Sequence, residues 1–245
     1  SNDLILLALE FLLSKNQNNK FNDLAGKKFL ITGGATSEKI DAARRITNNS
    51  SGMMGLLLAQ VARFRGATVT YIHGPLKLNP DLQEGIKNIE IKTGIDLIKV
   101  IRKEILNCDY LIMNAAVTDI RISNSIEKKI PKNEISKYFS NNFELVPDIL
   151  GDLKNYKKAH QLFVGFCAFT GEFENLKSIL KKKFEIKGCD YIFANPIDIE
   201  GQGFGHSSKN EGWLFDKDKM RFYFEKTTKI DLANNLINKI ISINK

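Results

Sequence analysis

Short apolar runs alternate along this chain with longer stretches in which apolar residues recur every three or four positions. The short runs are rich in β-branched and aromatic residues and predict strands over 29–31, 67–73, 110–113, 161–166 and 191–194. The longer stretches predict helices over 53–63, 97–106 and 174–184. Because strands and helices alternate, we expect a Rossmann-like α/β fold, with a doubly wound, mainly parallel sheet covered on both faces.

The N-terminal part of the chain has a different pattern. Residues 3–13 predict an amphipathic helix, and residues 14–22, rich in Asn and Lys, predict a linker. We therefore divide the chain into a helix and linker, 1–26, and one main domain, 27–245. The first two residues are Ser and Asn, which is typical of the remainder of a cleaved tag, so we expect a domain taken from a longer polypeptide.

The segment 122–143 is polar, rich in lysine and long for a connection inside a domain. Such segments are commonly lids, so we predict a mobile lid loop that carries Lys129 and Lys132. Two β-rich runs over 214–224 predict a hairpin, and the amphipathic stretch 229–243 predicts a closing helix.

Small and polar residues follow the predicted strands directly. Gly33, His73, Asn114, Gly165 and Asn195 each stand at the end of an apolar run. Ligands of doubly wound sheets bind beyond the carboxyl ends of the strands. We therefore expect the functional site at this edge of the sheet.

Two turns near the first strand favour a bound phosphate. Gly33 and Gly34 end the strand and let the backbone approach an anion closely, and Ser50-Ser51-Gly52 leads into the next predicted helix. The first turn lacks the third glycine of a dinucleotide fingerprint and the Gly-Lys-Ser/Thr ending of a P-loop. The pattern thus predicts a nucleotide site of another kind.

Composition narrows the class of protein. With 245 residues, 43% hydrophobic and 26% charged, the chain can bury one sizeable core. No apolar run reaches the ~20 residues of a membrane span, so we expect no membrane association. Cys108, Cys167 and Cys189 lack metal-ligand spacing and predict reduced thiols in a cytoplasmic protein.

The net charge of +8 raises the possibility of nucleic-acid binding. However, the lysines are scattered, and the dense run 181–183 has no interleaved aromatic residues. A small anionic substrate together with a nucleoside triphosphate explains the excess of lysine equally well. We therefore predict no nucleic-acid partner.

From residue 27 to the C-terminus the chain resembles phosphopantothenoylcysteine synthetase, also called phosphopantothenate-cysteine ligase. The motifs that carry the resemblance occur in the family's order: Gly33-Gly34-Ala35, Ile40-Asp41-x-x-Arg44-x-Ile46-x-Asn48-x-Ser50-Ser51-Gly52-x-Met54-Gly55, His73-Gly74-Pro75, Ala115-Ala116-Val117-Thr118-Asp119, Lys129-Ile130-Pro131-Lys132, Pro147-Asp148-Ile149-Leu150, Val164-Gly165-Phe166, Lys183 with Lys187, and Ala194-Asn195.

The resemblance implies a bacterial-type ligase of coenzyme A biosynthesis. In that family the carboxylate of 4'-phosphopantothenate attacks the α-phosphate of CTP with the help of Mg²⁺, and cysteine then displaces CMP from the acyl-cytidylate. The resemblance also implies a homodimer in which part of one subunit covers the partner's site. A flavin-dependent phosphopantothenoylcysteine decarboxylase, fused or associated, is a further expected partner.

Site residues follow from the same motifs. Asn48 is expected to hold the acyl oxygen while cysteine attacks, and Lys129 to offset negative charge from the lid. The residues expected to bind substrate and nucleotide are Gly33, Gly34, Ser50, Ser51, Gly52, Ala115, Ala116, Asp119, Pro147, Asp148, Ile149, Leu150, Phe166, Lys183 and Lys187. The motifs identify no metal ligands.

Several positions depart from the family pattern. Met53 replaces a lysine, Pro131 replaces another lysine, and Pro196 replaces an aspartate, while residues 203–210 also differ. These departures keep a non-catalytic nucleotide-binding module open as an alternative. A NAD(P)-dependent oxidoreductase is a weaker alternative, because no Tyr-x-x-x-Lys pair is present.

Overall fold

The computed structural model describes residues 2–13, 22–199, 209–218 and 220–243. Within these residues one sheet contains eight strands: β1 (Lys28–Gly33), β4 (Thr68–His73), β5 (Lys87–Glu90), β6 (Tyr110–Met113), β9 (Leu162–Phe169), β10 (Tyr191–Pro196), β11 (Lys209–Phe215) and β12 (Met220–Thr228). Their order is β12-β11-β10-β9-β6-β1-β4-β5; β11 pairs antiparallel with both β10 and β12, and all other neighbours in this sheet pair parallel. The predicted mainly parallel sheet and the C-terminal hairpin are confirmed.

The strand order changes direction beside β1. The chain passes from β1 to β4 and β5 on one side, and then returns to β6, β9 and β10 on the other. A sheet of this topology has a crevice outside the carboxyl ends of the two strands at which the order reverses, here β1 and β6. Gly34 and Asn114 are the residues that follow these two ends.

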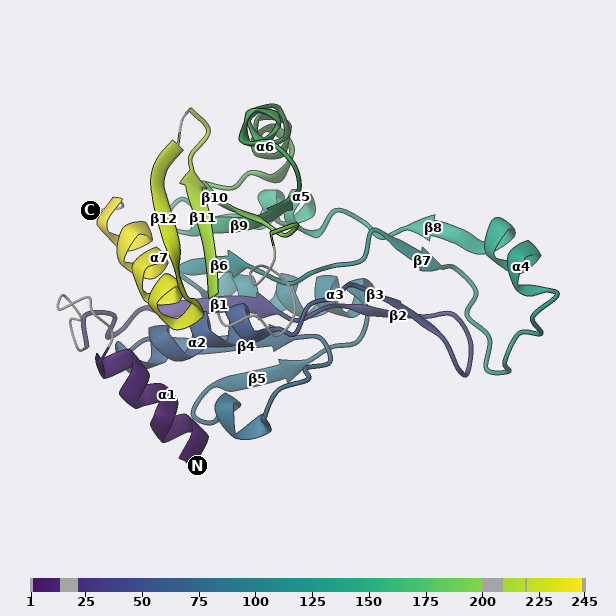
Figure 1. Ribbon diagram of the computed structural model, residues 1–245, viewed down its shortest axis with the longest axis horizontal. Coiled ribbons are helices and arrows are strands. Elements are labelled where there is room, and N and C mark those ends of the chain that lie inside the picture. The colour runs from purple at the N-terminus through teal and green to yellow at the C-terminus, as the bar shows by residue number, and fades with distance from the viewer. Residues whose placement is uncertain (1, 14–21, 200–208, 219, 244–245) are drawn as a thin grey trace.

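Helices cover both faces of the sheet (Figure 1). The helices α1 (Asn2–Leu13), α2 (Met53–Phe64) and α7 (Lys229–Ile243) pack on one face, and α3 (Gly94–Glu104), α5 (Ile149–Leu153) and α6 (Phe173–Lys187) pack on the other. Side chains of β1 alternate between the two layers, Phe29 and Ile31 toward α2 and Leu30 toward α3. Single turns of 3₁₀ helix lie in the connections: η1 (Pro80–Gln83), η2 (Ile105–Asn107) and η3 (Lys154–Tyr156).

The predicted helices are present, with bounds that local contacts explain. The helix α3 begins at Gly94, because Thr93 and Asp96 form a capping box at its start. The helix α6 continues to Lys187, where Gly188 adopts a positive φ of 61° and ends it. The sequence therefore located these helices correctly and gave the bounds of α2 to within one residue, but it placed the start of α3 and the end of α6 inside their observed positions.

The N-terminal helix α1 belongs to the main core. Leu7 and Phe11 are buried in the same hydrophobic cluster as β1 and α2, and the rings of Phe11 and Phe64 lie 5.5 Å apart. Residues 14–21 of the predicted linker lie outside the described residues, as do the family departures at 203–208.

Two small antiparallel sheets extend from the body as an arm, which we define as residues 37–47 and 120–145 (Figure 1). One pairs β2 (Ser37–Lys39) with β3 (Arg45–Thr47), and the other pairs β7 (Ile120–Ile122) with β8 (Phe143–Leu145), next to α4 (Ile135–Asn142).

The segment 122–143, predicted as a lid loop, is not a loop throughout, because it contains α4 and contributes to β7 and β8. Isoleucines in it bury against the neighbouring hairpin, and Ile40, Ile122 and Ile130 form a separate hydrophobic cluster. The polar, lysine-rich composition concealed these few apolar contacts. That the arm moves as a lid stays a prediction.

Candidate functional site

Two glycine turns meet at the carboxyl end of β1. Gly34 and Gly52 have φ values of +72° and +81°, a conformation that other residues rarely adopt. A Cβ on Gly52 would lie 3.2 Å from Gly34 Cα and 2.2 Å from Leu76 Cδ2. A Cβ on Gly55 in the first turn of α2 would lie 2.9 Å from Gly33 Cα. The backbone of the first turn and the start of α2 therefore lie in direct contact.

The segment after β6 forms the facing wall of the crevice. The hydroxyl oxygen of Thr32 accepts a hydrogen bond from the N–H of Ala115 at 3.1 Å. The hydroxyl oxygen of Thr36 likewise accepts from the N–H of Thr118 at 3.0 Å. Both threonines are buried. They fix the backbone of residues 115–118 against the end of β1.

A cleft of about 330 Å³ opens at this wall. Its lining contains many of the residues that the motifs predicted for substrate and nucleotide binding: Ala115, Asp119, Pro147, Asp148, Ile149, Leu150, Phe166 and Lys187. The remaining lining residues are Met113, Val117, Thr118 and Val146. A cleft at a topological switch point that combines apolar residues with the polar Thr118, Asp119, Asp148 and Lys187 is typical of a small-molecule site.

A second cavity, of about 40 Å³, lies at the Ser50-Ser51-Gly52 turn. The two cavities share Phe166, which is half-buried between them. Met53 donates its N–H to the Ser51 hydroxyl at 3.4 Å, and the Tyr71 hydroxyl donates to the Gly52 carbonyl at 3.2 Å. The other lining residues are Met54, Asn114, Asn195, Asn210 and Lys229.

Asn48 lies beside the cleft but its amide is engaged. Its Nδ2 donates to the carbonyl oxygens of Ala116 at 3.2 Å and Val117 at 3.0 Å. Asn48 thus connects the strand β3 to the backbone of the cleft wall. A substrate oxygen that used this amide as a donor would have to replace one of these two bonds.

The two lysines of α6 occupy one face of the helix, as their spacing predicted. Lys187 lines the cleft and forms an ion pair with Asp148, with 3.3 Å between Nζ and Oδ1. Lys183 lies beside the thiol of Cys167; burial raises the pKa of this thiol, and the nearby Lys183 ammonium partly offsets that effect. Only Lys187 of the two lines the cleft.

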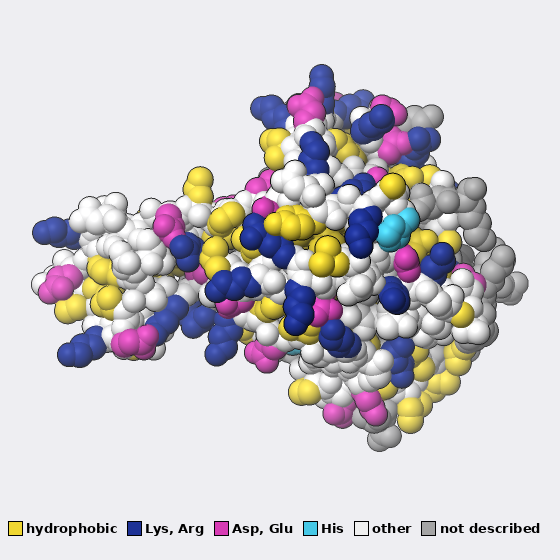
Figure 2. Space-filling model, turned by 180° about the vertical axis from the view of Figure 1, so that it is seen from behind, with side chains coloured by type: hydrophobic (Ala, Val, Ile, Leu, Met, Phe, Trp, Pro, Cys, Tyr) yellow, Lys and Arg dark blue, Asp and Glu magenta, His cyan; other side chains and the backbone are white. Residues whose placement is uncertain are grey.

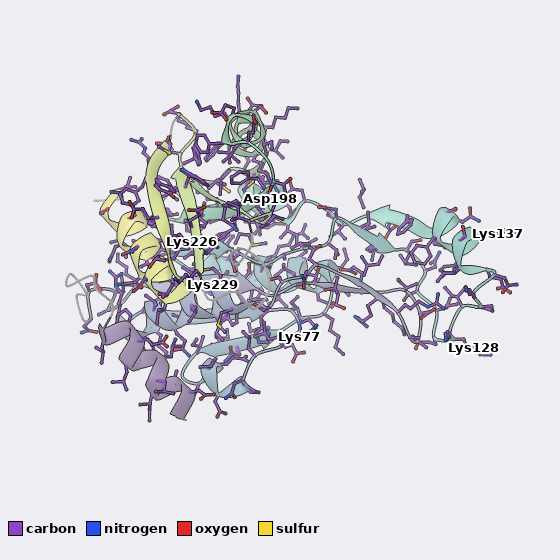
Figure 3. All side chains as sticks on the ribbon, in the orientation of Figure 1. Lys77, Lys128, Lys137, Asp198, Lys226 and Lys229 are labelled. Carbon is purple, nitrogen blue, oxygen red and sulfur yellow. The ribbon has the colours of Figure 1, made fainter. Side chains whose placement is uncertain are left out.

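Lys129 lies apart from both cavities, on the arm. Its neighbour Ile130 is buried, and the N–H of Ile130 donates to the Asp41 carboxylate at 3.1 Å, while Arg44 Nη2 donates to the Ile130 carbonyl at 2.7 Å. Figure 3 shows the adjacent residue, Lys128, at the outer part of the arm. The structure therefore does not bring Lys129 together with the other predicted site residues of its own chain.

The buried thiols are unreactive in character. Burial raises the pKa of Cys108 and of Cys189 to about 12, and the three cysteines are free.

On the face seen in Figure 2, basic side chains are interspersed with acidic and hydrophobic ones. No helix in the described part of the chain has the length and hydropathy that crossing a membrane requires.

The described residues contain no group of three His, Cys, Asp or Glu side chains that could hold a metal ion by itself. Two carboxylates, those of Asp119 and Asp148, line the cleft. Asp148 caps α5 by accepting the N–H of Gly151 at 3.2 Å, in addition to its pair with Lys187. In the described part of the chain, the Asp119 carboxylate makes no such contact and is open to a ligand.

Asn114, which the sequence placed at the functional edge of the sheet, lines the smaller cavity. Sequence reasoning missed two further lining residues, Asn210 and Lys229, which come from the C-terminal hairpin and helix, far along the chain. One signal was available for Lys229, because a lysine at the first position of a helix opposes the helix dipole.

Comparison with known proteins identifies relatives over most of the chain. The family described as "DNA/pantothenate metabolism flavoprotein C-terminal domain" matches residues 24–243. The coenzyme A biosynthesis bifunctional protein CoaBC of Vibrio cholerae is 35% identical over 195 residues, which are 80% of this chain and 47% of that protein. A cysteine/cysteine sulfinic acid decarboxylase of an unknown prokaryotic organism is 35% identical over 221 residues, 90% of this chain and 59% of that protein. The chain thus spans about half the length of these curated relatives.

A solved structure agrees with these matches. The crystal structure of the C-terminal domain of the coenzyme A biosynthesis bifunctional protein CoaBC superposes with a TM-score of 0.70 at 32% identity. The similarity covers 90% of this chain and 98% of that one. The mixed α/β architecture with its mainly parallel central sheet is therefore shared.

Proposed function

The chain belongs to the family of the DNA/pantothenate metabolism flavoprotein C-terminal domain, and we propose that it is the ligase that joins 4'-phosphopantothenate to L-cysteine through an acyl-cytidylate. One observation carries this proposal. Eight of the residues predicted for substrate and nucleotide binding line one cleft at the switch point of the sheet. That cleft adjoins the phosphate-binding type of turn at Ser50-Ser51-Gly52.

The two cavities suit different parts of CTP. The cleft of about 330 Å³ is at the lower end of small-molecule sites and suits the nucleoside of CTP, with Phe166 against the base. The smaller cavity faces the first turn of α2, where backbone N–H groups and the helix dipole favour phosphate. The α-phosphate would then lie between the cavities, near Phe166.

The reaction requires positioning and charge compensation more than proton transfer. In the first step a carboxylate oxygen of 4'-phosphopantothenate bonds to the α-phosphorus of CTP, and pyrophosphate leaves. In the second step the cysteine amine bonds to the acyl carbon, CMP leaves, and the amine releases a proton to solvent. Fixed donors and cations that stabilise the charge formed in both steps are the expected contribution of the protein.

Asn48 would act in the second step. Its amide already donates to two carbonyl oxygens of the cleft wall, Ala116 and Val117. Exchanging one of these bonds for the acyl oxygen would hold the intermediate at the wall while cysteine attacks. Losing one donor of this kind costs on the order of 10²- to 10³-fold in rate.

Magnesium fits the site only in company with the nucleotide. Mg²⁺ in phosphate-transferring enzymes is commonly held by one or two carboxylates together with substrate phosphates and water. Asp119 supplies one available carboxylate at the cleft. When bound, the ion would offset the charge of the phosphates, and Asp119 would orient it from the protein side.

Lys129 would serve the cleft of a second subunit. The arm extends away from the body of its own chain (Figure 1). Within the arm, hydrogen bonds to Asp41 and Arg44 hold the backbone of Ile130. A homodimer in which the arm covers the partner's cleft would bring Lys129 to the nucleotide. Because the chain spans about half of its curated relatives, we further propose that it acts next to a flavin-dependent phosphopantothenoylcysteine decarboxylase, fused or associated.

Turnover tests the proposal directly. We expect CTP to be converted to CMP and pyrophosphate only when 4'-phosphopantothenate is present, with at least tenfold lower kcat/KM for ATP. Release of pyrophosphate without cysteine would support the acyl-cytidylate. Binding of CTP with no turnover under any of these conditions would favour the alternative of a non-catalytic nucleotide-binding module.

A further inference from the structure

Lys229 is a largely buried lysine. It begins α7 directly after β12, and only 4% of it is exposed. Among the described residues its ammonium has no hydrogen-bond or ion-pair partner, and burial lowers the pKa of Lys229. A largely buried charge without a counter-ion costs free energy, and an anionic ligand would offset that cost.

The position of Lys229 at the start of α7 increases the free-energy cost of its charge. Thr228 and Asp231 cap α7, because the N–H of Asp231 donates to the Thr228 hydroxyl at 3.2 Å and that hydroxyl donates to Asp231 Oδ2 at 2.8 Å. Lys229 therefore occupies the first helical position, where the helix dipole disfavours a positive charge. The carboxylate of Asp231 is engaged with threonine hydroxyls rather than with Lys229.

Lys229 lines a cavity with the right chemistry for an anion. The cavity of about 40 Å³ is also lined by the Ser50-Ser51-Gly52 turn, and by three amide side chains, those of Asn114, Asn195 and Asn210. Its volume is the space of about one to three water molecules, which excludes a nucleobase. Met53 lines the same cavity but carries no charge.

We propose that Lys229 supplies the positive charge of a phosphate subsite in this cavity and binds the pyrophosphate end of the nucleotide. The identity of the ligand as a nucleotide rests on the proposed function, whereas binding of an inorganic anion does not. Lys229 begins α7 and lines the cavity, whereas the lining residue that begins α2, Met53, is uncharged.

The test uses inorganic pyrophosphate as the probe, measured by calorimetry on the whole chain. Lys229→Met removes the charge and keeps the length of the side chain. We expect the dissociation constant for pyrophosphate to rise by about 10- to 100-fold, the loss of one hydrogen bond to a charged group. The free protein should be at least as stable as the parent, since an unpartnered buried charge is removed.

Lys226→Met is the matched control, because Lys226 lies three positions earlier on β12 and is exposed (Figure 3). It should change neither affinity nor stability. Met53→Lys added to Lys229→Met should restore part of the affinity, because Met53 lines the same cavity. Titration with 4'-phosphopantothenate should show no comparable loss in Lys229→Met.

A structural role would give the opposite pattern. If Lys229→Met loses stability while pyrophosphate binds as before, the proposal is wrong. It is also wrong if the parent protein binds no pyrophosphate, or if the loss is confined to 4'-phosphopantothenate. Normal pyrophosphate binding in a protein without ligase turnover would instead refute the proposed function and leave the phosphate subsite standing.

Discussion

Replacing Gly52 by alanine tests whether the two glycine turns are packed as described. At φ +81° an alanine costs about 1–2 kcal/mol of left-handed strain. Its Cβ would also lie 2.2 Å from Leu76 Cδ2, and relief of such an overlap costs about 1–3 kcal/mol. We therefore expect Gly52→Ala to lower the free energy of unfolding by about 2–5 kcal/mol.

Gly26→Ala separates the two contributions. Gly26 has nearly the same φ, +79°, but a Cβ there would meet nothing within 4 Å. This variant should lose only the strain, about 1–2 kcal/mol. Urea unfolding at constant m-value measures both free energies.

The double variant Gly52→Ala with Leu76→Ala completes the cycle. Removing the Leu76 methyl groups takes away the closest contact but leaves the 3.2 Å approach to Gly34. The two substitutions should therefore be less destabilising together than the sum of the single losses. If Gly52→Ala and Gly26→Ala cost the same, the close packing of the turns is refuted.

Three further predictions address the site and the assembly. Asn48→Asp should form acyl-cytidylate and release pyrophosphate but stop before the amide forms, whereas Lys129→Gln should suppress pyrophosphate release. Quenched reactions with labelled CTP measure both products. The role assignment is wrong if Asn48→Asp makes no acyl-cytidylate while Lys129→Gln makes it normally. Burial acts to raise the pKa of Asp41, but hydrogen bonds from Ala43, Ile130 and Arg44 outweigh it and hold the pKa below its ordinary 3.8, so the stabilisation is present above pH 3.8 and lost as pH falls through the lower value. Asp41→Asn should flatten this loss in acid unfolding, and an unchanged pH profile would contradict the anchoring role. Sedimentation should give a mass near twice 27.7 kDa, and a fully active monomer would exclude the dimer.

The central sheet was predictable because its strands are buried on both faces. Runs such as Tyr110 to Met113 are apolar throughout, and the predicted bounds match β6. The edge strand β5, Lys87–Glu90, is mostly exposed and polar, so no such run marks it. The short strands of the arm were not predicted for a related reason: they bury only scattered isoleucines and so contain no continuous apolar run.

The cleft was predictable to the extent that its residues lie in contiguous motifs. Pro147 to Leu150 and Ala115 to Asp119 follow single strands or open a helix, so their neighbours in sequence are their neighbours in space. Lys229 and Asn210 reach the smaller cavity only through the packing of the C-terminal hairpin and helix. No local pattern encodes that juxtaposition, apart from the unfavourable position of the lysine.

The separation of Lys129 from the cleft of its own chain has a genetic consequence. If the arm serves the partner, a subunit with a defective cleft still carries an intact arm, and a subunit with a defective arm still carries an intact cleft. Mixed dimers of two inactive variants, one altered at Asn48 and one at Lys129, would then contain one complete site. Two such null alleles would then complement each other within a single cell.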